Sequence, residues 1–160
     1  MSIKSGDTIP NVTLKHKTAD GINDITTDEL FSGKKAVVFA VPGAFTPTCS
    51  AKHLPGFVNK FADLKAKGID LIACISVNDA FVMDAWGVDQ NVGDDILMIA
   101  DGSADFTTAI GQELDLKDRG MGIRSARYAM IVDDGIVTEM LAEEPGAFEV
   151  SSAEYVLSKL

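Results

Sequence analysis

Residues 36–57 read AVVFAVPGAFTPTCSAKHLPGF, and the prediction of fold class starts from them. The first six residues form a continuous apolar run, which is typical of a strand buried inside a parallel sheet. Pro42 and Gly43 then mark a loop. Apolar residues recur after the loop at the spacing of one helix face: Leu54, Phe57, Val58, Phe61 and Leu64. The stretch therefore predicts strand, loop and helix, with a kink at Pro55 one turn after Cys49.

The elements on either side of this stretch predict one α/β domain covering residues 1–160. Apolar runs at 69–77 and 96–100 predict two more buried strands, and 127–132 and 136–142 flank Asp133-Asp134-Gly135, a hairpin signal. This order predicts a mixed central sheet flanked by helices. The shorter signals predict an N-terminal β-hairpin around Asp20-Gly21, capping boxes from Thr26 to Glu29 and from Ser151 to Glu154, a helix from Asn78 or Asp79 to Trp86 closed by Gly87, and a helix over 103–110.

Composition narrows the classes of partner. The chain has 160 residues, of which 46% are hydrophobic, and its formal net charge is -10. Because nucleic acids and anionic membranes attract basic surfaces, neither is an expected partner. No apolar run reaches the roughly 18 residues that a membrane span needs. The first residues show no secretory h-region, so the expected location is the cytoplasm.

The two cysteines, Cys49 and Cys74, lie 25 positions apart and form no C-x-x-C pair. Together with His16 and His53 they make a poor set of zinc ligands at these spacings. A fold stapled by disulfides is also not expected at this length and cysteine content.

Cys49 falls at the start of the predicted helix, where the loop leaves the carboxyl end of a buried strand. Open α/β sheets place their ligands at such junctions. Unpaired N–H groups and the helix dipole favour a thiolate over a thiol. A helix end contributes about 1 kcal/mol, whereas an activated thiolate needs about 3–4 kcal/mol, so a nearby cation is expected as well. By position alone, Cys49 could equally be an inert apolar residue.

Pro42, Thr46 and Cys49 spell P-x-x-x-T-x-x-C, which is the active-site pattern of the peroxiredoxins. Residues 42–57 resemble the type II, or peroxiredoxin 5, subfamily in particular. The resemblance continues through 73–82 and 127–137 and extends over nearly the whole chain. It implies a thioredoxin-like fold with an N-terminal hairpin, and a thiol peroxidase that takes hydrogen peroxide and small alkyl hydroperoxides.

The resemblance also implies roles for four residues. Cys49 matches the peroxidatic cysteine, whose thiolate attacks the peroxide and becomes a sulfenic acid. Thr46 matches the threonine that hydrogen-bonds the peroxide, Pro42 the proline that shields the thiolate, and Arg127 the arginine beside it. Arg124 would point to the opposite face from Arg127 in an extended strand, so it is a weaker candidate, for a salt-bridge partner near the site.

Two further side chains allow two interpretations each. His53 lies four residues after Cys49 and could serve as its base, but the family assigns its histidine no such role, so packing or hydrogen bonding is favoured. Cys74 lies inside an apolar run and is expected to be a buried structural thiol. Residues 144–152 contain no resolving cysteine. A one-cysteine cycle is therefore expected, with glutathione and glutaredoxin, or thioredoxin, as the reductant.

The family commonly forms homodimers around the active-site loops. Phe45, Phe81 and Trp86 are candidates for such a face, or else belong to the core. No metal, haem or nucleotide cofactor is implied. Two other functions remain possible: a disulfide reductase of the same fold, although Thr46 stands where its first cysteine would be, and a non-catalytic redox-sensing module.

Overall fold

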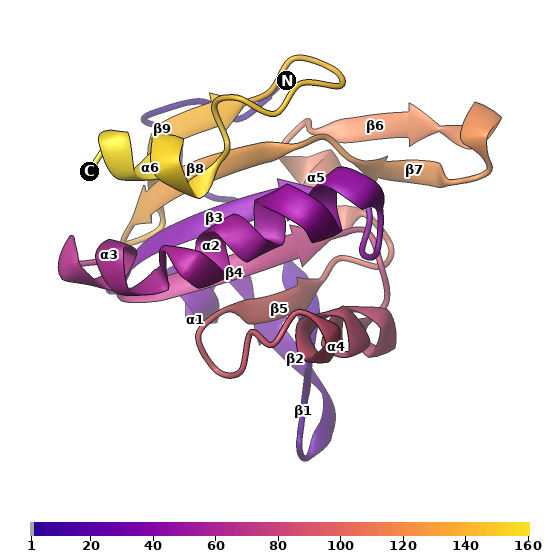
Figure 1. The fold of residues 1–160 in the computed structure, drawn as a ribbon, viewed down its shortest axis with the longest axis horizontal. Coiled ribbons are helices and arrows are strands. Elements are labelled where there is room, and N and C mark those ends of the chain that lie inside the picture. Colours follow the sequence, from indigo (N-terminus) through magenta and orange to yellow (C-terminus); the bar gives the residue numbers. More distant parts are fainter. Residues whose placement is uncertain (1) are drawn as a thin grey trace.

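The computed structural model describes residues 2–160 and contains a mixed seven-stranded sheet in the order β2-β1-β5-β4-β3-β8-β9. The central strands β3, β4 and β5 are parallel, and the other neighbouring pairs are antiparallel (Figure 1). The strands are β1 (Thr13–Thr18), β2 (Gly21–Thr26), β3 (Lys35–Val41), β4 (Leu71–Ser76), β5 (Leu97–Ala100), β8 (Tyr128–Asp133) and β9 (Ile136–Ala142).

Helices cover both faces of this sheet, as the sequence predicts. One face packs against side chains of α2, α3, α4 and α6, and the other against side chains of α1 and α5. The helices are α1 (Thr27–Phe31), η1 (Cys49–His53), α2 (Leu54–Asn59), α3 (Phe61–Ala66), α4 (Ala80–Asp89), α5 (Asp105–Ala109), η2 (Lys117–Arg119) and α6 (Ala153–Ser158).

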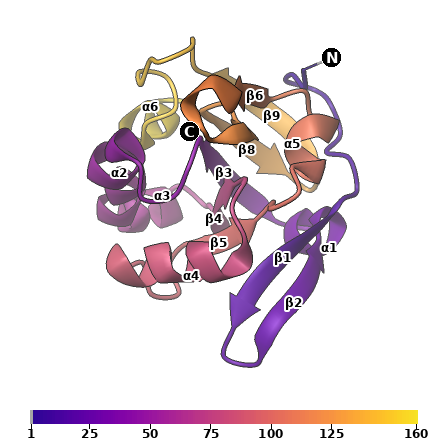
Figure 2. The ribbon, with the colours of Figure 1, turned by 90° about the vertical axis from the view of Figure 1, so that its right-hand side faces the viewer.

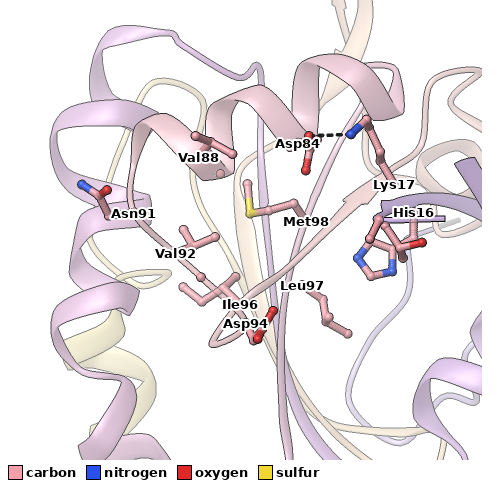
Figure 3. Close-up of a pocket in the computed structure, with 14 residues that line it drawn as sticks. His16, Lys17, Asp84, Val88, Asn91, Val92, Asp94, Ile96, Leu97 and Met98 are labelled. Carbon is pink, nitrogen blue, oxygen red and sulfur yellow. Dashed lines mark hydrogen bonds and ion pairs between the residues drawn. The ribbon is translucent and has the colours of Figure 1, made fainter. Parts of the chain in front are cut away.

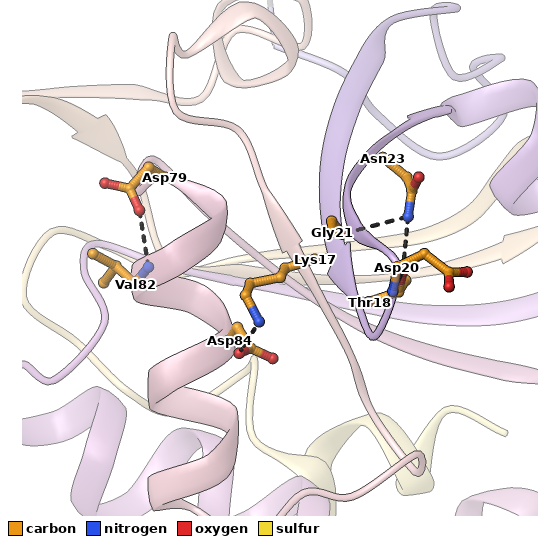
Figure 4. A network of polar contacts seen from close by, with 8 residues as sticks. All are labelled: Lys17, Thr18, Asp20, Gly21, Asn23, Asp79, Val82 and Asp84. Atoms are coloured by element: carbon orange, nitrogen blue, oxygen red, sulfur yellow. Dashed lines mark hydrogen bonds and ion pairs between the residues drawn. The ribbon is translucent and has the colours of Figure 1, made fainter.

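The predicted N-terminal hairpin is β1 and β2, which projects from the body of the protein (Figure 2). Lys17 on β1 pairs with Asp84 on α4 at 3.0 Å, so one ion pair joins the hairpin to a helix. Figure 4 shows this pair beside Asp79, whose side chain caps α4 by accepting from the N–H of Val82 at 2.9 Å.

The helix after Cys49 is less regular than one kink at Pro55 would make it. It opens with the π-helical turn η1, in which the N–H of Leu54 donates to the carbonyl of Cys49. Pro55 has no N–H to donate and its ring crowds the carbonyl one turn earlier, which fits a widened turn just before it. A second irregularity at Lys60 separates α2 from α3.

Two predicted helix ends are wrong. Gly87 does not close α4, which continues to Asp89; a Cβ at Gly87 would lie 2.9 Å from Cγ of Met98, so close packing explains the glycine. The cap of α6 is Ser152, because the hydroxyl of Ser151 donates to Glu143 instead. The capping box from Thr26 to Glu29 is confirmed.

The sequence also missed a small second sheet and an internal cap. Strands β6 (Glu113–Leu116) and β7 (Gly122–Ser125) form an antiparallel pair of their own. The buried carboxylate of Asp101 accepts from the N–H groups of Phe106 and Thr107, at 3.1 and 2.8 Å, and orders the start of α5. Within residues 2–160, no helix is both long enough and apolar enough to cross a bilayer.

Candidate active site

Cys49 lies where the sequence places it, in the first helical turn after β3. The N–H of Ser50 donates to the carbonyl of Thr46 at 2.9 Å, so the turn begins at Thr46. The Cys49 side chain is 0% exposed. Its sulfur therefore meets the protein interior and the positive end of a helical turn rather than bulk water.

Arg127 supplies the cation that the sequence argument requires. Its Nη2 donates to Sγ of Cys49 at 3.1 Å, and its Nη1 lies 2.7 Å from Nδ1 of His53. The prediction that Arg127 begins a strand is wrong. It lies in the two-residue connection between β7 and β8. The guanidinium remains charged at any physiological pH, so it presents a fixed positive charge to the sulfur.

His53 holds the guanidinium and is itself held by the backbone. Its Nε2 lies 2.9 Å from the carbonyl oxygen of Ser151. A carbonyl only accepts, so Nε2 carries the proton and Nδ1 accepts from Arg127. Burial, and then the Arg127 charge, lower the pKa of His53 to about 3. His53 is thus neutral at physiological pH with both nitrogens engaged, which supports the hydrogen-bonding interpretation over a base for Cys49.

Three aromatic rings surround His53. The rings of Phe39, Phe57 and Phe148 lie 5.0, 5.7 and 5.0 Å from the imidazole. Phe148 also lies under the guanidinium of Arg127, with 5.7 Å between Cζ and the ring centroid. These contacts fix the pair in an apolar setting, where a charge interacts more strongly than in water.

The loop of residues 42–46 lies against Arg124. The hydroxyl of Thr46 donates to the carbonyl of Gly43 at 2.7 Å, so it is turned back into its own loop. The Nη1 of Arg124 lies 3.5 Å from the carbonyl of Pro42. Because β7 ends at Ser125, Arg124 and Arg127 do not share one extended strand, so the alternation that would put them on opposite faces does not apply and both reach this region. A Cβ at Gly43 would lie 3.0 Å from Nη1 of Arg124, so the loop packs closely against this side chain.

Cys74 is buried in β4, as predicted, and is 0% exposed. Burial and the neighbouring Cys49 raise the pKa of its thiol well above the ordinary value. It is therefore a poor nucleophile in the folded protein. Both cysteines are free.

The three candidate interface residues divide between surface and core. Phe45 and Phe81 are 52% and 65% exposed. Trp86 is fully buried, and its Nε1 donates to the hydroxyl of Ser50 at 3.0 Å, next to Cys49. The surface alternative is therefore wrong for Trp86.

A hollow of about 710 Å³ lies away from Cys49, between β1, α4 and the segment leading to β5. Figure 3 shows His16, the Lys17–Asp84 pair and Asn91 around an apolar floor that includes Met98. It contains no thiol. Among the described residues, no group of three or more His, Cys, Asp or Glu side chains could hold a metal ion.

Sequence reasoning missed the residues from the C-terminal part of the chain that contact the His53–Arg127 pair. Ser151 accepts from His53 through its backbone, which no residue pattern reveals. Phe148 and Glu143 belong to a connection between β9 and α6 that carries no regular structure of its own. The signal available was the isolated aromatic in a polar, Gly- and Pro-containing segment.

Comparisons with known proteins identify the family of the chain. The Redoxin family model matches residues 4–157. Peroxiredoxin-2E, chloroplastic, of Arabidopsis thaliana is 52% identical over 99% of this chain and 70% of its own. Reduced Prx3 of Vibrio vulnificus, crystallised with h2o2, is 56% identical with a TM-score of 0.95, covering 98% of both chains. Peroxiredoxin 5 of Alvinella pompejana has 35% identity and a TM-score of 0.87, covering 98% of this chain and 96% of that one.

The Redoxin match, these relatives and the thioredoxin-like sheet place the chain in the peroxiredoxin class of thiol-dependent peroxidases. Within that class, this chain belongs to the type II, peroxiredoxin 5-like, family. Its substrate is a peroxide and its role is antioxidant. Membership in this family favours a peroxidase over the disulfide reductase and the non-catalytic module.

Proposed function

We propose that Cys49 is the peroxidatic thiol, in one domain covering residues 1–160. The observation that carries this is the 3.1 Å hydrogen bond from Arg127 to its sulfur at the start of a helical turn. The thiolate attacks one peroxide oxygen as the O–O bond breaks. Cys49 becomes a sulfenic acid, and the other oxygen takes up a proton and leaves as water or an alcohol.

Charge grows on the leaving oxygen in this step, so donors aimed at it lower the barrier. Arg127 already donates to the sulfur and so supplies such a donor. By resemblance, the Thr46 hydroxyl would exchange its bond to Gly43 for one to the peroxide, and Pro42 would keep water from the sulfur. Hydrogen peroxide and small alkyl hydroperoxides are the proposed substrates. The related Vibrio vulnificus protein, crystallised with h2o2, supports the first of them.

The proposed cycle uses one cysteine of the chain. Cys74 is fully buried within the central strand β4, where its thiol is held in the unreactive form. An external thiol would then condense with the sulfenic acid, releasing water and forming a mixed disulfide. A second thiol would free Cys49 by exchange. We propose glutathione with glutaredoxin as the donor, and thioredoxin as the alternative.

The proposed assembly is a homodimer that covers the active-site loop. Phe45 combines 52% exposure with a φ of 64°, an unusual conformation for a bulky residue. Phe81, at 65% exposure, lies at the start of α4. Strain and exposed aromatic surface beside a site are typical of an interface. We propose the cytoplasm as the location; two free cysteines fit a reducing compartment.

Peroxide consumption with glutathione and glutaredoxin tests the cycle. Multiple turnovers should disappear in Cys49→Ser and persist in Cys74→Ser. Loss in both variants would make Cys74 a resolving thiol and contradict the one-cysteine cycle. Thioredoxin replaces glutaredoxin in a parallel assay, which identifies the reductant.

A further inference from the structure

The carboxylate of Glu143 bonds both ends of the connection between β9 and α6 to each other. This connection is drawn in yellow tones in Figure 1. Oε2 of Glu143 accepts four hydrogen bonds. Three come from the N–H groups of Glu149, Val150 and Ser151 at 2.7, 2.9 and 2.9 Å, and one from the Ser151 hydroxyl at 2.7 Å. The N–H of Glu143 donates to the carbonyl of Arg127 at 3.1 Å. One residue thus joins the backbone of Arg127 to that of Ser151.

The four donors suit an ionised carboxylate. Burial alone would raise the pKa of Glu143, but the hydrogen bonds from Ser151, Val150 and Glu149 outweigh it and hold that pKa below its usual range. Hydrogen bonds to a charged acceptor are about twice as strong as those between neutral groups. A neutral amide at this position could still offer one oxygen to the four donors, but it would carry no charge.

The segment closed by Glu143 ends on the active site. The carbonyl of Ser151 accepts from Nε2 of His53 at 2.9 Å, and Nδ1 of His53 accepts from Arg127 at 2.7 Å. The same arginine donates to Sγ of Cys49 at 3.1 Å. Phe148, inside the segment, packs on both the imidazole and the guanidinium. Arg127 is oriented by its contacts with His53 and Phe148, and both contacts therefore depend on how this segment is folded.

We propose that Glu143 is a positioning residue of the peroxide reaction: by closing residues 143–151 it holds Ser151 and Phe148 against the His53–Arg127 pair, and so keeps the guanidinium on the sulfur of Cys49. The inference rests on the proposed function of Cys49. A purely structural role would change the stability of the C-terminal segment and leave the reactivity of the sulfur unchanged.

The test compares Glu143→Gln with the matched control Glu144→Gln, whose side chain is exposed at the next position. Oxidation of Cys49 by hydrogen peroxide is followed in a single turnover through the fluorescence of Trp86, the one tryptophan of the chain, which hydrogen-bonds Ser50. We expect Glu143→Gln to slow this step about tenfold, because small displacements of a catalytic group are costly. It should also move the pH profile of Cys49 alkylation to higher pH. Glu144→Gln should match the wild type in both measurements.

The decisive experiment repeats the Glu143→Gln substitution in a protein that already carries Arg127→Gln. If Glu143 acts through Arg127, Glu143→Gln adds no further slowing when Arg127 is already Gln, since coupled residues are not additive. Equal slowing in both backgrounds would overturn the inference, as would a Glu143→Gln protein that reacts like wild type. Should Glu143→Gln fail to fold by circular dichroism, Ser151→Ala removes one of the four donors and should show the same two changes, smaller. A wild type without any Cys49-dependent reaction would instead refute the proposed function itself.

Discussion

The guanidinium of Arg127 donates to the sulfur of Cys49 across 3.1 Å, although 78 positions separate the two residues. Strand pairing brings them together. Tyr128 lies opposite Ala40 in the antiparallel pair of β8 and β3, so the residue before Tyr128 lies beside the loop that follows β3. The sulfur and its cation thus lie in segments that adjoin two paired strands of one sheet, and that pairing brings the two segments together.

Removing this cation should slow the first chemical step. Arg127→Gln is expected to lower the second-order rate constant for reaction of Cys49 with hydrogen peroxide by about 10²–10³, which is the usual cost of losing one preorganised donor. Stopped-flow fluorescence after mixing with one equivalent of peroxide measures it. Arg119→Gln, in the exposed turn η2, is the control and should react like wild type. A rate constant for Arg127→Gln within a few-fold of wild type would contradict the assigned role.

Burial of a neutral His53 should make the protein less stable in acid. The pKa of His53 is about 3 in the folded protein, whereas an unperturbed histidine, as in the unfolded chain, has a pKa of 6.5. Between these values the unfolded chain binds a proton that the folded protein does not. Stability therefore falls as the pH drops from 6.5 toward 3.

The size of this effect is about 2 kcal/mol between pH 6 and pH 4, from 1.36 kcal/mol per pKa unit. Urea unfolding at a series of pH values, compared between wild type and His53→Gln, isolates the contribution of His53 from that of the carboxylates. The variant should lose less stability over this interval. Parallel curves for the two proteins would show that His53 takes up a proton in the folded state.

The buried carboxylate of Asp101 should contribute more to the free energy of unfolding than its position in a loop suggests. Asp101→Ala would leave the N–H groups of Phe106 and Thr107 and the hydroxyl of Thr107 without their acceptor. We expect a loss of about 2–3 kcal/mol in the free energy of unfolding. Asp105→Ala, an exposed acidic residue in the first turn of the same helix, should change it by less than about 0.5 kcal/mol. Denaturant titration compares the two, and equal losses would count against the cap.

The proposed dimer predicts that exposed aromatic rings near the site carry its affinity. Phe45→Ala and Phe81→Ala should each weaken self-association by about tenfold or more, since buried aromatic anchors contribute over 1 kcal/mol. Ile136→Ala, exposed by 40% on β9, serves as the control and should leave it unchanged. Sedimentation velocity over a range of concentrations measures the dissociation constants. A protein that is monomeric at every concentration would contradict the proposed homodimer.

Much of the fold follows from local patterns. Continuous apolar runs identified β3, β4 and β5 because strands covered on both faces need apolar residues at every position. Helical spacing found the residues of α2 and α3 that pack on the sheet, and the capping box at Thr26 marked the start of α1. These signals lie within a few residues of one another, where the backbone alone relates the side chains. The strands β6 and β7 escaped because four-residue, half-buried strands carry no such pattern.

The sequence by itself determined which cysteine we propose as the nucleophile, the helical turn that carries it and the family pattern around it, because these residues are neighbours along the chain. Tertiary structure alone decided how His53 is used: its ring bonds a backbone carbonyl 98 positions away and an arginine 74 positions away. It also decided that the Ser151 hydroxyl bonds Glu143 rather than capping α6, since the partly buried carboxylate of Glu143 competes for that hydroxyl. Such partners meet only when the sheet has formed, and their chemistry depends on burial that no local pattern encodes.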